Sequence, residues 1–276
     1  MYTGEQRQKS HSYDIPCHKV NLGWLASMKK SISTKTTSKP DKNESITVAQ
    51  FLKRLKALQS AEAAESHSHL ASDQEDVIMG VRMGHIFALA KEFIDMPLGE
   101  IEKLLESPIH EARVGAVSIM DFQARRKKTS QERRKELFDL YIRRHDRINS
   151  WDLVDRSAIY VVGGYLFDQP RDILYKLARS KDTWKRRTAI VSTAYFIRQD
   201  DVEDTFKIAE MLLNDDQDLI HKATGWMLRA AGEKDRQKLI SFLDRFAASM
   251  PRVALRYALE HFDKKQRDHY LSLKKG

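Results

Sequence analysis

Cysteine is nearly absent from this sequence, and Cys17 is the only one in 276 residues. A single cysteine excludes an intrachain disulfide and a structural zinc site built on thiolates, and it is typical of a reducing compartment. No apolar run approaches the roughly eighteen residues of a membrane-spanning helix, and the first residues lack the apolar core of a secretory signal. We therefore expect a protein of the cytoplasm, or of the nucleus in a eukaryote.

Glycine and proline are also scarce, with 11 and 6 residues, and no stretch alternates apolar and polar residues as a strand does. From Val81 onward, apolar residues recur at the spacing of amphipathic helices. Residues that favour helix starts occur throughout this region. They are Pro108, Ser130, Asn149, Asp182 and Pro251. The pattern predicts an all-α fold, in which Gly163-Gly164 is a close helix contact rather than a phosphate-binding loop.

Three helical segments are alike in register: HEARVGAV, WKRRTAIV and IHKATGWM. Arg113, Arg187 and Lys222 occupy corresponding places in them, at intervals of 74 and 35 residues. The helix that carries Asp155 splits the longer interval into 42 and 32 residues. This is the period of HEAT and armadillo helical pairs, which stack into a solenoid with a long concave binding surface. The sequence therefore predicts a curved α-solenoid of HEAT/armadillo-like repeats.

The composition changes near Ile46. Residues 1–45 are polar and rich in Ser, Thr and Lys, as in KKSISTKTTSKPDKNES, and we expect a largely disordered basic tail there. We expect residues 46–276 to form the helical-repeat domain. Basic residues outnumber acidic ones by 48 to 39, which gives a net charge of +9. This balance favours an anionic partner, with nucleic acid first and a membrane surface second.

Asp155 is the first candidate for chemistry, because no basic residue lies one turn away from it on its own helix. The structural alternative is that a basic residue on the next helix pairs with it. Asp152 differs, since Arg156 follows at i+4 and Asp152 would be the third helical residue if Asn149 caps the helix. We interpret Asp152 as a local stabiliser of the helix start.

Two tryptophans and an arginine accompany Asp155. Trp151 lies one turn before it on the same face, where a tryptophan also serves as a core residue. Trp226 has Lys222 at i−4 and Arg229 at i+3, an arrangement that either grips nucleic acid or packs two basic stems over a half-buried ring. Arg187 falls at the edge of an apolar stripe and needs an anion, for which Asp155 or a phosphate would serve.

Other catalytic signatures are missing from the sequence. It contains no GxxxxGK[ST] loop, no GxGxxG turn after a strand and no HExxH pair. We therefore expect no nucleotide cofactor and no metal ion.

Four motifs, in this order, resemble the AlkD-like DNA alkylation repair glycosylases: INSWDLVD, DTWKRRTAIVSTAYFIR, DLIHKATGWMLR and MPRVALRYALEHF. The similarity runs from about Val48 to the C-terminus. It implies HEAT-like repeats and cleavage of the glycosidic bond of purines alkylated at N3 or N7 in duplex DNA, without a cofactor. Carried over by motif, the catalytic aspartate matches Asp155, the two site tryptophans match Trp151 and Trp226, and the site arginine matches Arg187. We further expect a monomer, because a solenoid that wraps one duplex needs no partner, and a location with the DNA, in the nucleoid of the cytoplasm or in the nucleus.

In this family-based interpretation, Asp155 stabilises an oxocarbenium-like sugar and orients water, and Arg187 keeps the pKa of Asp155 low. The phosphates would be held by basic residues of the repeats, and the candidates are Arg82, Arg113, Lys222 and Arg229. The alternative from another functional class is a non-catalytic HEAT-repeat scaffold that binds DNA or protein. Periodicity and charge alone do not separate the two.

Overall fold

The computed structural model describes residues 46–63 and 76–273. These residues belong to one compact unit, Asn43–Gly276. The predicted tail, residues 1–45, lies outside the described residues. Within the described ranges the chain is helical, and its only β pairing is one isolated parallel bridge between Val77 and Ile109. None of the helices described is long and apolar enough to cross a membrane.

From α4 onward the helices follow one another with short connections. The first part contains α2 (Val48–Lys56), α4 (Met83–Glu92), α5 (Leu98–Leu105), α6 (His110–Arg125), α7 (Gln131–Arg143) and the 3₁₀ turn η3 (His145–Arg147). The middle contains α8 (Trp151–Ser157), the π-helix η4 (Ala158–Gly163), α9 (Gly164–Leu166), α10 (Asp172–Ala178) and α11 (Thr183–Arg198). The last part contains α12 (Glu203–Met211), α13 (Asp218–Lys234), α14 (Arg236–Phe246), α15 (Arg252–Ala258) and α16 (Lys264–Ser272).

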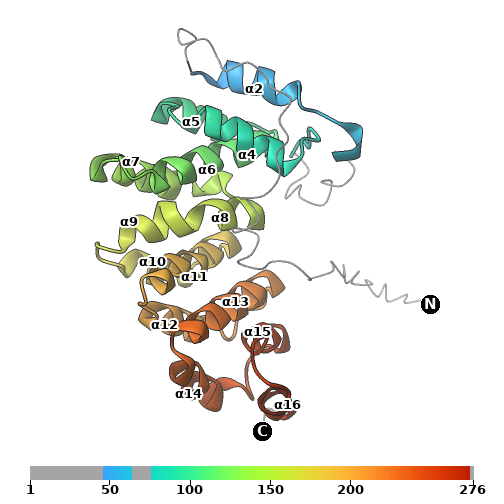
Figure 1. Cartoon of the computed structure of the whole chain (residues 1–276), viewed down its shortest axis with the longest axis vertical. Helices are drawn as coiled ribbons and strands as arrows, with labels where there is room; N and C mark the ends of the chain where they lie inside the picture. Colours follow the sequence, from blue (N-terminus) through green and yellow to red (C-terminus); the bar gives the residue numbers. More distant parts are fainter. Residues whose placement is uncertain (1–45, 64–75, 274–276) are drawn as a thin grey trace, which may run out of the picture. The chain divides into compact units, whose positions relative to one another are not determined.

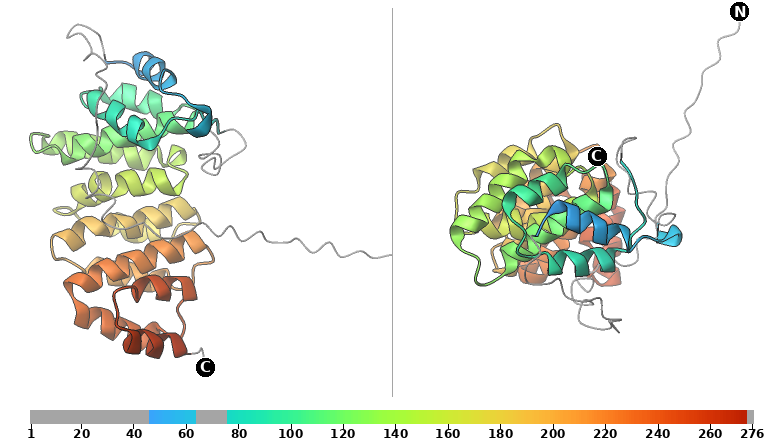
Figure 2. Two further views of the ribbon diagram at one scale, coloured as in Figure 1. Left: turned by 45° about the vertical axis from the view of Figure 1, so that its right-hand side comes forward. Right: turned by 90° about the horizontal axis from the view of Figure 1, so that it is seen from above.

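The helices are arranged in two rows. The long-helix row consists of α4, α6, the continuous α8–η4–α9 helix, α11, α13 and α15, each packed on the next. The short-helix row consists of α5, α7, α10, α12 and α14, whose members pack on the long helices. Figures 1 and 2 show α6, α8, α11 and α13 side by side in chain order. The predicted all-α helical-repeat solenoid is confirmed.

The repeat period is also visible in the helix starts. From α6 onward, the long helices begin at His110, Trp151, Thr183, Asp218 and Arg252, which lie 32 to 41 residues apart. Most helix starts lie close to the residues that predicted them. Ser130, Asp182 and Pro251 are N-caps, and the Ser130 and Asp182 side chains accept backbone N–H groups of the first turn. Ser150 rather than Asn149 is the N-cap of α8.

A π-helical turn interrupts the helix that carries Asp155. It ends at Gly163, which lies against the backbone carbonyl of Ser192 on α11, while Gly164 faces the ring of Tyr195. A β-carbon at Gly163 would overlap that carbonyl oxygen, whereas one at Gly164 would meet only a ring carbon, 3.3 Å away. The prediction of a close helix contact at Gly163-Gly164 is confirmed.

Substitution at Gly163 should therefore destabilise the fold more than substitution at its neighbour. We expect Gly163→Ala to lower the free energy of unfolding by about 1–3 kcal/mol, because backbone must move to admit the methyl group. Gly164→Ala should cost less, since a ring can turn aside. Gly84→Ala in α4, where a β-carbon meets nothing within 4 Å, should stabilise by roughly 0.5–1 kcal/mol. Urea unfolding monitored by circular dichroism measures all three, and equal effects at Gly163 and Gly164 would contradict the packing argument.

Candidate active site

Asp155 and Arg187 form a bidentate ion pair between adjacent long helices. Arg187 Nε donates to Asp155 Oδ1 over 2.9 Å, and Arg187 Nη2 donates to Oδ2 over 2.7 Å. The two residues are the fifth of α8 and of α11, so they lie at the same level of neighbouring helices. The structural alternative for Asp155, a basic partner on the next helix, is therefore confirmed. The anion that the sequence analysis expected beside Arg187 is the carboxylate of Asp155.

Arg187 also connects the pair to a third helix. Its remaining nitrogen, Nη1, donates to the carbonyl oxygen of Leu219 at the start of α13 over 2.5 Å. One guanidinium therefore joins α8, α11 and α13. The Arg187 side chain is 7% exposed, whereas Asp155 keeps 16% of its side-chain surface accessible. Asp155 is thus the less buried member of the pair.

Burial raises the pKa of the Asp155 carboxyl, and Arg187 opposes this shift through its charge and its hydrogen bonds. The negative charge of Asp152 adds to the increase. Arg187 lowers this pKa, as the sequence analysis expected, but burial of the carboxylate outweighs that contribution and the net shift is upward. Above its raised pKa, Asp155 remains ionised within the ion pair.

The two predicted tryptophans lie on α8 and α13. Trp151 is half-buried and precedes Asp155 by one turn on the same face. Trp226 is 8% exposed, and its indole nitrogen has no hydrogen-bond partner among the described residues. Trp226 follows Leu219, the carbonyl partner of Arg187, by two turns. Within the described ranges no arginine or lysine lies over either ring, so the predicted flanking of Trp226 by basic side chains does not form a cation–π pair.

Asp152 has partners that the sequence did not indicate. His110 Nε2 lies 2.8 Å from Asp152 Oδ2, and Ser150 Oγ donates to Oδ1 over 2.6 Å. The predicted stabilisation by Arg156 is wrong, because Arg156 is buried and binds other groups. Its Nε donates to Ser118 Oγ over 2.9 Å, its Nη1 lies 3.3 Å from Asp121 Oδ2, and its guanidinium lies over the rings of Phe87 and Phe122.

A buried polar network adjoins the ion pair. Thr188, next to Arg187, shares its hydroxyl with Tyr141 at 2.9 Å and with His145 at 3.0 Å. Burial lowers the pKa of His145 to about 4 and raises that of Tyr141, so both stay neutral at physiological pH. Sequence patterns gave no sign of this network, because its members come from α7, η3 and α11.

The four predicted phosphate contacts have different surroundings. Arg82 is exposed at the start of α4 and pairs with Glu62. Lys222 is half-buried, with no ion-pair partner among the described residues, and Arg229 is 7% exposed and pairs with Glu260. Arg113 has 0% exposure and pairs with Asp76 at 2.6 Å. A phosphate contact by Arg113 therefore has no support here, because its guanidinium is enclosed and already neutralised.

A register of charged residues runs through the long-helix row. Asp155, Arg187, Lys222 and Arg256 are the fifth residues of α8, α11, α13 and α15. Arg256 is exposed and has no ion-pair partner in the part of the chain that the structure describes. The sequence analysis missed Arg256, although the repeat register would have placed it in line with Lys222.

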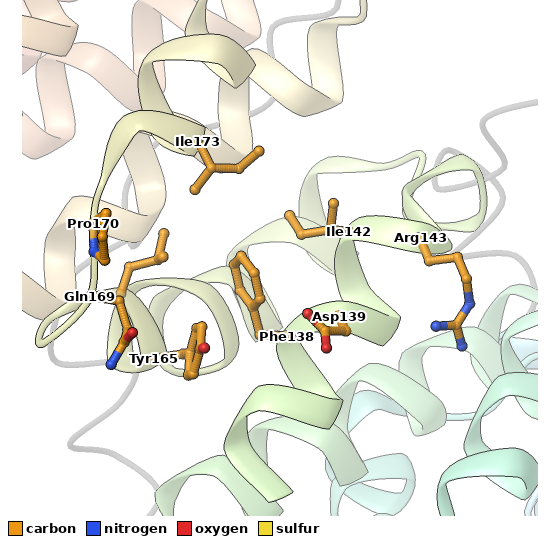
Figure 3. Close-up of a pocket in the computed structure, with 9 residues that line it drawn as sticks. Phe138, Asp139, Ile142, Arg143, Tyr165, Gln169, Pro170 and Ile173 are labelled. Carbon is orange, nitrogen blue, oxygen red and sulfur yellow. The ribbon is translucent and has the colours of Figure 1, made fainter. Parts of the chain in front are cut away.

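An apolar groove of about 430 Å³ lies elsewhere, between α7 and the α9–α10 segment (Figure 3). Phe138, Tyr165 and Ile173 are among its lining residues, and none of the predicted site residues contributes to it. Its charged rim is already paired, since Asp139 binds Lys135 and Arg143 binds Glu102. The groove is therefore separate from the candidate site.

Comparisons with known proteins agree with the fold and the motifs. A family model described as DNA alkylation repair enzyme matches residues 51–262. Among solved structures, a predicted DNA alkylation repair enzyme from Enterococcus faecalis is similar, with a TM-score of 0.59 and 18% identity. The alignment covers 75% of this chain and 97% of that one, and at this identity it shows a shared fold. No curated protein sequence matches the chain.

Removing the arginine should leave a buried carboxylate without its counter-charge. We expect Arg187→Met to destabilise the protein by about 3–5 kcal/mol at pH 8. The folded-state pKa of Asp155 is raised, so its contribution favours folding at low pH and is lost as pH rises through that pKa. Protonation at low pH therefore removes the penalty, and the difference from wild type should shrink at pH 5.

Urea unfolding at both pH values measures this, with Lys185→Met as the control. Lys185 lies in the same turn and has no carboxylate partner among the described residues. If Arg187→Met lowers the free energy of unfolding equally at pH 5 and pH 8, Asp155 is not the charge that the substitution leaves unpaired.

Proposed function

The chain belongs to the DNA alkylation repair enzyme family, and from this premise we propose that it is a monofunctional DNA glycosylase. In this proposal it hydrolyses the glycosidic bond of N3- and N7-alkylated purines in duplex DNA, acts as a monomer and works where the DNA is, in the nucleoid or nucleus. The supporting observation is the Asp155–Arg187 pair. Its carboxylate is fixed by two hydrogen bonds, the Asp155 side chain is 16% exposed, and Trp151 lies one helical turn away.

The substrate needs little acid–base assistance. A purine alkylated at N3 or N7 carries a positive charge, so it leaves with the bonding electron pair as a neutral base. The bond from C1′ to the purine breaks, and the deoxyribose gains oxocarbenium character. Water then attacks C1′ and releases a proton, giving an abasic site and the free base. Asp155 would stabilise the cationic sugar and orient the water.

The arginine beside Asp155 suits a water-dependent reaction. A guanidinium stays protonated and does not form a Schiff base with the sugar, as a lysine amine would. Its two hydrogen bonds hold the carboxylate in one orientation, which preorganises the negative charge before the sugar becomes cationic. This is why we propose simple hydrolysis without strand cleavage.

The tryptophans would add ring faces to the same environment. An aromatic face attracts a cationic group by about 0.5–2 kcal/mol, depending on desolvation. Trp151 lies on the helix of Asp155, and Trp226 lies on the helix that Arg187 contacts through Leu219. In this proposal both rings would lie against a sugar bound at the carboxylate, and Trp226 would do so through the 8% of its surface that is exposed.

We propose that the phosphates are held by Lys222, Arg256, Arg229 and Arg82. Lys222 and Arg256 are the best candidates, because they continue the register of Asp155 and Arg187 along the row and have no ion-pair partner among the described residues. Arg229 would have to exchange Glu260 for a phosphate, and Arg82 would have to exchange Glu62.

A second candidate function is a non-catalytic scaffold that binds DNA or protein. The observation in its favour is that both oxygens of Asp155 already accept hydrogen bonds from Arg187. A purely structural ion pair has the same geometry. The two functions differ in whether the removal of Asp155 abolishes base release.

Base release from a duplex with a single N7-methylguanine tests the glycosylase proposal. We expect Asp155→Asn to lower the rate by about 10²–10³, because a preorganised charge is lost. Alkali treatment converts each abasic site to a strand break for quantification. The control is Asp139→Asn, the same change at an exposed carboxylate on the short-helix row, and it should retain wild-type activity. A wild-type protein that releases no base, or an Asp155→Asn variant as active as wild type, would refute the proposal.

Binding to undamaged duplex tests the phosphate contacts. We expect Lys222→Ala to weaken binding at every sequence and to reduce the slope of log K against log salt by about 1. Lys264→Ala removes the same charge from an exposed position on α16 and should leave the slope unchanged. Fluorescence anisotropy across a salt series gives both slopes. If the two lysine variants behave alike, Lys222 does not contact a phosphate.

A further inference from the structure

A second carboxylate, Asp152, lies one turn before Asp155, and both of its oxygen atoms have side-chain partners. Asp152 accepts from Ser150 through one oxygen and lies 2.8 Å from His110 Nε2 through the other. His110 is the first residue of α6 and its side chain is only 1% exposed. The contact therefore joins the starts of two neighbouring long helices, directly beside Trp151.

This arrangement replaces the usual cap of α8. Ser150 is the N-cap, yet its hydroxyl donates to Asp152 instead of accepting a backbone N–H of the first turn. The orientation of that turn is consequently fixed from outside the helix, by His110 on α6. Trp151 lies in the sequence between Ser150 and Asp152, whose side chains are hydrogen-bonded to each other, and Asp155 is on the next turn.

The two carboxyls titrate differently. Burial acts to raise the pKa of Asp152, but the hydrogen bonds and charge from His110, together with the Ser150 hydroxyl, hold it below its usual range. The pKa of Asp155 is raised, and Asp152 contributes to that increase. Among the described residues, the charged or titratable groups that interact with Asp155 are Arg187 from α11, Asp152 from its own helix and Tyr141 from α7. Asp152 therefore stays charged at a pH at which Asp155 begins to bind a proton.

The charge of Asp152 changes the electrostatic environment that a bound cation would meet at Asp155. Asp155 and Arg187 together are neutral, so they present a dipole rather than a net charge. With Asp152 ionised, a negative charge is added one turn from Asp155, and the charge of His110 offsets part of it. A cationic sugar is attracted by a net charge over a longer distance than by a dipole.

We propose that Asp152, held by His110 and Ser150, is a positioning residue of the site: it orients the first turn of α8 and maintains a fixed negative charge one turn from Asp155. The inference rests on the proposed glycosylase function for its effect on rate. Its effect on Asp155 is a property of the folded protein and is measured without substrate.

The test uses Asp152→Asn, which keeps the shape of the side chain and removes its charge. Carboxyl ¹³C NMR of aspartate-labelled protein, with the Asp155 signal identified by its loss in Asp155→Asn, gives the pKa of Asp155 directly. For like charges one helical turn apart we expect this pKa to fall by roughly 0.5–1 unit in Asp152→Asn. The acid limb of the rate–pH profile for N7-methylguanine release should move by the same amount, and the maximal rate should fall about tenfold.

Two controls separate charge from position. Ser150→Ala keeps both charges and should leave the pKa of Asp155 in place while lowering the maximal rate. Asp146→Asn removes an exposed charge from η3 and should change neither quantity. Asp152→Ser is the second uncharged variant, should the asparagine disturb folding as judged by thermal melts.

The outcomes are distinct. A folded Asp152→Asn protein in which Asp155 titrates as in wild type overturns the inference, and so does a Ser150→Ala protein with the wild-type rate. A wild-type protein that releases no base refutes the proposed function instead, while the titration still decides whether Asp152 controls the charge of Asp155.

Discussion

The rest of the site depends on the three hydrogen bonds of one guanidinium. Arg187 binds both carboxylate oxygens of Asp155 on α8 and the carbonyl of Leu219 on α13. Enclosing a charged pair costs solvation, which only close geometry and complete hydrogen bonding offset. Here burial raises the pKa of Asp155 in spite of the arginine, so the ion pair recovers only part of the lost solvation. It fixes the relative position of three helices and holds the carboxylate in one orientation.

The π-helix allows one helix to meet α11 at two places. Asp155 contacts Arg187, and Gly163, eight positions later, lies against Ser192 of the same α11. In a regular α-helix, two residues with this separation point about 80° apart. The wider turns of η4, closed by i→i+5 bonds, reduce the rotation per residue and bring Gly163 back toward the face of Asp155. Gly163 has no side chain, which permits the close approach there.

The repeat period explains which contacts were predictable from sequence. Asp155 and Arg187 are 32 residues apart, as are Arg187 and Leu219, and His110 and Asp152 are 42 apart. Only Asp155 and Arg187 occupy equivalent positions, as the fifth residues of α8 and α11, whereas Asp152 lies one position past the equivalent of His110 and Leu219 lies three positions before Lys222, the equivalent of Arg187. The period therefore predicts which helix carries each partner, but it predicts the partner's position only for the first pair. Arg156 was wrongly paired with Asp152 because the spacing within one helix gives no information about its actual partners, Ser118 and Asp121 on α6. Arg113 was misassigned because its partner Asp76 lies outside the helices, where periodicity gives no information.

Pairing with arginine would disable some catalytic roles but not the one proposed. A carboxylate that accepts two hydrogen bonds from a guanidinium is a poor general base, since taking up a proton would weaken those bonds. A reaction that starts from a cationic purine does not need a strong base, because the leaving group is already activated. It needs a negative group that is held in place before the charge develops, so that no reorganisation is required during bond cleavage. In the proposed function, Asp155 would therefore stabilise a cationic sugar rather than abstract a proton, and its substrates would be purines that leave readily rather than unmodified ones.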